Sequence, residues 1–227
     1  MKTAAFFDKF SKEYASQDRY RYLYYRWLTN NIIKEIDRED CDIIDVGTGT
    51  GNLAIRLATK YPKSRILGVD ISKGMVNEAK AKCKRMGITN VRFKISSVEK
   101  LRTGRTDFVV SALVFHHIKE KGKVISNFYE SLSENGKLVI GDWFEPTKHY
   151  KKEIGALRRK NPKMAKEFDR SWKDSLKGMS RKYGKEHPKE YHVSQTDLAV
   201  IMKEAGFREP RILKSLLPNL AIVVGAR

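Results

Sequence analysis

The sequence predicts an α/β protein with a mostly parallel sheet and helices on both of its faces. Short apolar runs of strand length alternate with helical patterns from residue 41 onward, which is typical of strand–helix–strand units. A chain of 227 residues, 41% hydrophobic and 32% charged, can bury one core of this kind. Two strand-like runs close the chain, and we expect a hairpin whose last strand is antiparallel to the others.

The predicted elements follow one another in a regular order. Residues 4–37 carry apolar side chains at helical spacing and predict a helix. Ser72 is a candidate N-cap, and Gly87 a candidate terminator, for a helix over 72–87. We expect strands at 41–46, 65–70, 91–96, 106–114, 136–143, 210–217 and 219–227, and further helices at 52–61, 119–132 and 194–207.

Composition excludes several classes of protein. No apolar stretch approaches the roughly 20 residues of a membrane span, and the start "MKTAAFFDKF" is too short for a secretory signal core. Cys41 and Cys83 are too few for a disulfide framework, and their spacing fits no metal site. We expect a cytoplasmic globular protein with reduced thiols and no bound metal.

Basic residues exceed acidic ones by 19, and the excess is concentrated. Residues 41–141 carry 18 basic and 9 acidic side chains, and residues 142–190 carry 15 and 8. Such a surface can attract nucleic acid, an anionic membrane or an anionic small molecule. It can equally be a solvated, lysine-rich surface, and the sequence leaves this choice open.

The stretch "IIDVGTGTGNLA" (43–54) carries the most chemical information. Gly47, Gly49 and Gly51 fill the turn between the first strand and its helix, where positive φ angles and a close backbone approach to a ligand are expected. Asp70 ends the second strand, 19 residues after Gly51, where its carboxylate can accept hydrogen bonds from two ribose hydroxyls. Together they predict a site for a nucleoside-bearing cofactor.

The loop also discriminates among cofactors. Its third glycine comes one residue too early for the dinucleotide pattern, and it has no lysine for a nucleoside triphosphate loop. Asp45 would repel a pyrophosphate but suits a ligand with an ammonium or sulfonium group. These features predict S-adenosylmethionine, with S-adenosylhomocysteine as the product.

Four motifs in order resemble a known family. "DVGTGTG", "GVD", "TDFVVSALVFHHI" and "LSENGKLVIGDW" are similar to those of the class I, Rossmann-like S-adenosylmethionine-dependent methyltransferases, nearest the small-molecule branch that includes ubiquinone and menaquinone biosynthesis. The resemblance covers roughly 40–143, and "AGF … AIVVGAR" fits the closing strands. It implies a seven-stranded sheet in which only the last strand is antiparallel.

Residues 146–190 interrupt the alternation of strands and helices. A long polar segment inside a compact domain is usually functional. Its apolar positions have helical spacing and are Ile154, Leu157, Met164, Phe168, Trp172 and Leu176. We expect a single methyltransferase domain spanning 1–227. Its parts are an N-terminal helical cap (1–40), a cofactor-binding core (41–141), a helical insert that completes the cap (142–190), and a closing helix and strands (191–227).

The resemblance also implies roles for individual residues. Ser97 stands where the family often has an acid for the adenine amino group, and Val98 would use its backbone N–H. Asp70 can also be a simple helix-start acid, and Ile71 and Met75 can be core residues instead of adenine neighbours. The implied cofactor-binding set is Asp45, Gly47, Thr48, Gly49, Gly51, Asp70, Ile71, Met75, Ser97, Val98, Ser111 and Leu113.

The acceptor side is less defined. His116 or His117 is a candidate general base for a substrate hydroxyl, or the pair is structural at a helix start. Trp143 and Phe144 form a substrate wall or pack beneath the insert. Tyr14 belongs to a tyrosine-rich face that folds over the cofactor or buries its own apolar side.

Three functions remain open at the level of sequence. The first is methylation of a small molecule, anionic if the basic surface serves it. The second is an RNA methyltransferase using that surface, although no appended RNA-binding module is visible. The third is a non-catalytic cofactor-binding protein, which the intact Asp45, glycine loop and Asp70 argue against.

Overall fold

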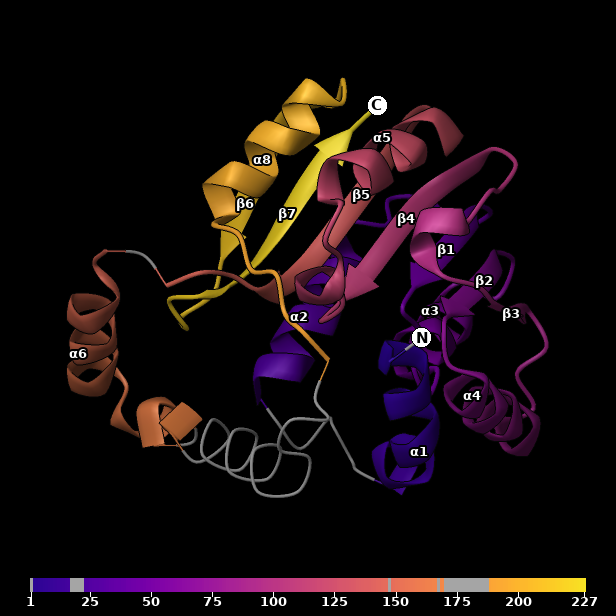
Figure 1. The fold of residues 1–227 in the computed structure, drawn as a ribbon, viewed down its shortest axis with the longest axis horizontal. Coiled ribbons are helices and arrows are strands. Elements are labelled where there is room, and N and C mark those ends of the chain that lie inside the picture. The colour runs from indigo at the N-terminus through magenta and orange to yellow at the C-terminus, as the bar shows by residue number, and fades with distance from the viewer. Residues whose placement is uncertain (1, 17–22, 147, 167, 170–187) are drawn as a thin grey trace.

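Seven strands form one sheet in the order β3-β2-β1-β4-β5-β7-β6 (Figure 1). The computed structural model describes residues 2–16, 23–146, 148–166, 168–169 and 188–227. The strands are β1 (Asp42–Val46), β2 (Arg65–Asp70), β3 (Val91–Ile95), β4 (Thr106–Ala112), β5 (Leu132–Trp143), β6 (Arg208–Lys214) and β7 (Leu220–Ala226). The α-helices with defined bounds are α1 (Lys2–Ser16), α2 (Leu23–Lys34), α3 (Asn52–Lys60), α4 (Lys73–Met86), α5 (Lys121–Ser131), α6 (Tyr150–Lys160) and α8 (Gln195–Glu204).

The strand directions confirm the predicted sheet. β1 pairs in parallel with β2 and β4, and the parallel ladder continues to β3 on one side and β5 on the other. β7 inserts between β5 and β6 and is antiparallel to both. Because the chain order reverses beside β1, the loops after β1 and β4 open a crevice at the carboxyl edge of the sheet.

Alternating side chains of the central strands supply two cores, one on each face. On one face Ile43 packs with residues of α2 and α3, and the apolar side of α6 joins this core through Ile154 and Leu157. On the other face Ile44 packs with buried residues of α5 and α8. The sheet is therefore covered on both sides, as the sequence predicts.

Several element boundaries differ from the expectations. The expected helix over 4–37 is described as α1 and α2, with 17–22 outside the described residues, and α2 ends at Lys34 in a tight turn. β4 stops at Ala112 because Leu113 has a φ of 62°, outside the strand region. β5 begins four residues early, where Leu132 pairs with Thr106 across an irregular register.

The insert is partly described. α6 is followed by helical residues at 162–166 and 168–169, and the expected apolar positions Trp172 and Leu176 lie outside the described residues. Phe168 contacts Trp143 with ring centroids 6.1 Å apart, and Trp143 contacts Tyr24 of α2 at 5.3 Å. No helix in the described ranges is long and apolar enough to cross a membrane.

Candidate active site

The glycine loop has the backbone that its sequence predicts. Gly47, Gly49 and Gly51 have φ angles of 67°, 54° and 77°, in the left-handed region where glycine carries no steric penalty. A Cβ at Gly47 would lie 2.3 Å from a methyl group of Val114, whereas a Cβ at Gly49 would meet no atom within 4 Å. Gly47 is thus required for packing, and Gly49 presents bare backbone to open space.

Asp70 anchors this loop from the end of β2. Its Oδ2 accepts a hydrogen bond from the Gly49 backbone N–H at 2.9 Å, and its Oδ1 accepts one from Ser72 N–H at 2.9 Å. Burial raises the pKa of the Asp70 carboxyl, while these hydrogen bonds act in the opposite direction. A carboxylate has about four lone-pair directions, so it retains acceptor capacity for a ligand.

Asp45 lies beneath the loop, in β1. Its side chain is 1% exposed and accepts a hydrogen bond from Thr48 Oγ1 at 2.7 Å. Burial raises the pKa of Asp45 to about 7, against the hydrogen bonds from Thr48 and the Ala54 backbone. Asp45 therefore touches the loop from below and does not line the space above it.

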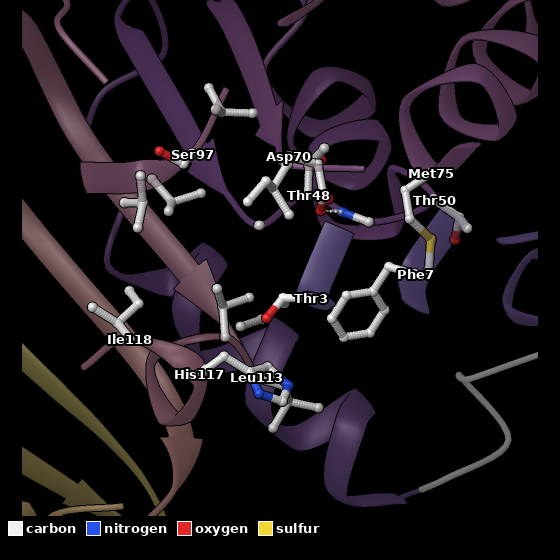
Figure 2. A pocket seen from close by; sticks show the side chains of 18 of the residues that line it. Thr3, Phe7, Thr48, Thr50, Asp70, Met75, Ser97, Leu113, His117 and Ile118 are labelled. Carbon is white, nitrogen blue, oxygen red and sulfur yellow. Dashed lines mark hydrogen bonds between the residues drawn. The ribbon is translucent and has the colours of Figure 1, made fainter. Parts of the chain in front are cut away.

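A cavity opens above the loop, between the carboxyl edge of the sheet and α1 (Figure 2). In the view of Figure 2, Thr3 and Phe7 of α1 lie between Thr48 and Asp70 on one side and His117 on the other. The predicted site residues that line it are Tyr14, Gly47, Thr48, Gly49, Asp70, Ile71, Met75, Ser97, Val98, Leu113 and His117. Those that do not are Asp45, Gly51, Ser111, His116, Trp143 and Phe144.

Residues outside the cavity have visible packing partners. Ser111 is fully buried and donates to the Val46 carbonyl at 3.1 Å, which ties β4 to β1. A Cβ at Gly51 would lie 3.0 Å from Ala79 of α4, so this glycine lets α3 and α4 approach closely. Phe144 is 3% exposed within the core on the α5 and α8 face.

The two adjacent histidines have different surroundings. His116 Nδ1 lies 2.7 Å from Asp142 Oδ1, and Asp142 Oδ2 accepts from the His116 backbone N–H at 3.0 Å. Burial alone would lower the pKa of His116, but the charge of Asp142 and this hydrogen bond raise it. His117 lines the cavity, with its ring centroid 4.1 Å from that of His116 and 5.6 Å from that of Phe7.

The segment after the insert holds this histidine pair in place. Tyr191 N–H donates to the His116 carbonyl at 2.6 Å, and the rings of His192 and His116 stack at 5.5 Å. Lys121 is buried and donates to the carbonyls of Ile118 and Tyr191. The chain thus returns from the insert across the end of β4.

Sequence reasoning missed several residues around the site. Asp142 carries a signal, since an acid at the end of the fifth strand adjoins the end of the fourth, where His116 stands. Thr3 and Phe7 belong to the expected N-terminal cap, but the packing of α1 against α4 decides that these side chains of α1 reach the cavity. Tyr25, which also lines the cavity, belongs to the expected tyrosine-rich face. The other unpredicted lining residues are Val46, Thr50, Asn52, Val69, Ser96, Glu99, Ala112, Val114 and Ile118.

The donor set fits an adenosyl cofactor. Bare backbone at Gly49, a carboxylate at Asp70 and the apolar surfaces of Ile71 and Met75 can hold a ribose and an aromatic base. Hydroxyl and backbone groups at Ser97 and Val98 can meet the polar edge of that base. Among the described residues, no group of three or more His, Cys, Asp and Glu is arranged to hold a metal ion.

Comparison with known proteins identifies the family. The sequence profile of the methyltransferase domain family matches residues 37–206, most of the chain. The chain belongs to the class I S-adenosylmethionine-dependent methyltransferases. S-adenosylmethionine is the cofactor of this family, and the cavity above the glycine loop has the chemistry to hold it.

Relatives of this chain have names that specify different methyl acceptors. The demethylmenaquinone methyltransferase of Bacteroides fragilis is 30% identical over 124 residues, which are 52% of this chain and 49% of that protein. The malonyl-[acyl-carrier protein] O-methyltransferase of Acetivibrio thermocellus is 29% identical over 117 residues, 50% of this chain and 40% of that protein. The chain thus spans half the length, or less, of these two curated relatives.

A solved structure shares the fold along nearly the whole chain. The crystal structure of an S-adenosylmethionine-dependent methyltransferase from Aquifex aeolicus superposes with a TM-score of 0.65 at 22% identity. The match covers 96% of this chain and 97% of that one, so the elements outside the profile match also have counterparts in the shared fold.

Proposed function

We propose that the protein transfers a methyl group from S-adenosylmethionine to a small molecule. The observation that carries this proposal is the cavity itself, which joins the glycine loop and Asp70 to a wall of Phe7, Tyr14 and His117. A space covered by a helix suits a small acceptor better than a folded RNA. Proximity and exclusion of water contribute most to such a reaction.

The chain's own residues have distinct roles in this proposal. When bound, S-adenosylmethionine supplies an electrophilic methyl group on a sulfonium centre. Asp70 accepts from the ribose hydroxyls, Ile71 and Met75 flank the adenine, and the glycine loop lies along the methionine part. Gly51, Ser111 and Asp45 act indirectly, because their contacts fix the loop and the strand ends.

His117 is the proposed general base, and it is needed only when the acceptor arrives protonated. It lines the cavity, whereas His116 points its Nδ1 at Asp142. We therefore propose that His116 and Asp142 orient His117 rather than meet the acceptor. Trp143 and Phe144 would act from behind the wall, by packing beneath the insert and in the core.

The proposed acceptor is an anionic or hydroxylated metabolite of the cytoplasm. The names of the two relatives include a malonyl group on a carrier protein and demethylmenaquinone, so related sequences serve both acidic and quinone-type acceptors. Basic residues around α6 favour an anion, and two free, buried cysteines suit a reducing compartment.

Two experiments test this function: calorimetric measurement of ligand binding, and an assay of methyl transfer. We expect S-adenosylmethionine and S-adenosylhomocysteine to bind and NAD not to bind. Labelled methyl groups should then pass to the low-molecular-weight fraction of a cell extract and not to total RNA. Transfer to RNA, with affinity that falls steeply as salt rises, would replace the proposal with an RNA methyltransferase; binding without any transfer would favour the non-catalytic alternative.

A further inference from the structure

α1 lies beside α4 (Figure 1). Its cavity side contributes Thr3, Phe7 and Tyr14 to the lining. Phe7 also touches the ring of His117, with centroids 5.6 Å apart. The placement of α1 therefore decides the shape of the cavity at its acceptor end.

One carboxylate fastens α1 to the core. Asp8 Oδ1 accepts hydrogen bonds from Ser72 Oγ at 2.6 Å and from the Gly74 backbone N–H at 2.7 Å. These bonds lower the pKa of Asp8, so that its carboxylate is ionised at neutral pH. A negative charge at the first turn of α4 also interacts favourably with the helix dipole.

Ser72, the N-cap residue of α4, also contacts the cofactor end of the site through Asp70. Ser72 donates its backbone N–H to Asp70, the proposed ribose ligand, and its hydroxyl to Asp8. Ser72 is fully buried between these two carboxylates. A movement of α1 away from α4 would therefore shift Ser72 and, through it, the Asp70 carboxylate.

Gly74 makes this close approach of the helices feasible. A Cβ at Gly74 would lie 2.6 Å from Ser11 Oγ, 3.0 Å from Ser11 Cβ and 3.1 Å from the Asp8 carbonyl oxygen. The last two atoms cannot move without moving the backbone of α1. The contact between α1 and the first turn of α4 thus depends on Asp8 from α1 and on Gly74 from α4.

We propose that Asp8 is a positioning residue that locks α1 over the cofactor and sets Phe7 against His117. This role rests on the proposed function, because it assumes that the cavity takes S-adenosylmethionine. Asp8 does not line the cavity, and it acts through Ser72 and Gly74. Its loss is expected to speed cofactor release.

Three variants test the contact from both sides. Asp8→Ala removes both hydrogen bonds, Asp8→Asn keeps an acceptor without the charge, and Gly74→Ala crowds α1 while favouring the helical state of α4. Asp40→Ala, an exposed carboxylate in the loop before β1, is the matched control. The readouts are amide hydrogen exchange of residues 2–16 without ligand, and the dissociation rate of S-adenosylhomocysteine.

Asp8→Ala and Gly74→Ala should raise exchange in residues 2–16 and speed release about tenfold, since charge-assisted hydrogen bonds are lost or strained. Asp8→Asn should recover part of both, and Asp40→Ala should match the wild type. Unchanged exchange, or raised exchange with unchanged release, would overturn the proposal. If the wild type binds no S-adenosylhomocysteine, the proposed function fails, while exchange still reports on the contact.

Discussion

At the scale of single residues, burial controls the ionisation of the site. Asp45 and Asp70 are both carboxylates at strand ends, yet they face different surroundings. Asp70 lines the cavity and accepts two backbone hydrogen bonds, whereas Asp45 is sealed beneath the loop. We therefore expect substitutions at Asp70 and Asp45 to have different effects.

Replacing Asp70 with Ala should weaken S-adenosylhomocysteine binding by tenfold or more. The change removes hydrogen bonds to the cofactor, each worth roughly 1.5–3 kcal/mol, and also frees the Gly49 N–H that Asp70 holds. Calorimetry gives the affinity, and circular dichroism should show that the chain stays folded. Affinity equal to that of Asp40→Ala would reduce Asp70 to a helix-start acid.

Replacing Asp45 with Asn should stabilise the ligand-free protein at pH 8 by about 1–2 kcal/mol. The unfolded carboxyl titrates near 3.8 and the folded one near 7, so the native state binds more protons between these values. Stability is therefore lost as pH rises from about 4 to 7, and this penalty stays complete above 7. The asparagine amide is uncharged at every pH, so the variant does not suffer this loss of stability.

Urea denaturation of both proteins at pH 5 and pH 8 measures the Asp45 effect. The advantage of Asp45→Asn should be small at pH 5 and larger at pH 8. The opposite trend, with the wild type gaining stability as pH rises, would show that hydrogen bonds from the loop outweigh burial in setting the pKa of Asp45.

Replacing Asp142 with Asn should destabilise the protein by about 3–5 kcal/mol near pH 6, since one charged partner of a buried pair is lost. His116 has a raised pKa, so its contribution is present below pH 6.5 and disappears as pH rises through the folded value. Asp142 has a lowered pKa, set by His116 and its hydrogen bonds against burial, so its contribution disappears only in acid. The difference in urea stability between wild type and variant should narrow as pH rises through the raised pKa of His116. A constant difference would argue against a charged pair.

At the scale of elements, Gly47 and Gly49 have different roles in the same loop. Both have positive φ, which costs an L-residue about 1–2 kcal/mol. Only Gly47 also has a neighbour, Val114, in the way of a side chain. The loop thus combines a packing position with a ligand-facing position.

Gly47→Ala and Gly49→Ala should therefore differ in kind. The first should lower the melting temperature markedly and abolish cofactor binding, because the loop must shift. The second should lower it only slightly while still weakening binding, because the new methyl group enters open space above the loop. Differential scanning calorimetry with and without S-adenosylhomocysteine separates the effects, and equal thermal losses would contradict the assigned roles.

At the scale of the whole molecule, cofactor binding should stabilise the fold, because the cavity is built from the loop, three strand ends and α1 together. At a ligand concentration one hundred times Kd, linkage adds about 2.7 kcal/mol. For a chain of this size that corresponds to a rise in Tm of roughly 5–10 °C. S-adenosylhomocysteine should produce this rise in a thermal melt and NAD should not; a rise with NAD alone would refute the choice of cofactor.

The sequence by itself determined the sheet, the glycine loop and Asp70, because these depend on local features. Strand runs, helical spacing and positive-φ glycines are encoded within a few adjacent residues, and the structure confirms the sheet they predict. Tertiary structure alone decided which of the paired His116 and His117 faces the cavity, and that Asp45 lies beneath the loop. It also decided the contact of Asp8 with α4, which joins residues more than sixty positions apart. Such contacts arise from the packing of whole elements, whose relative placement no local pattern of side chains specifies.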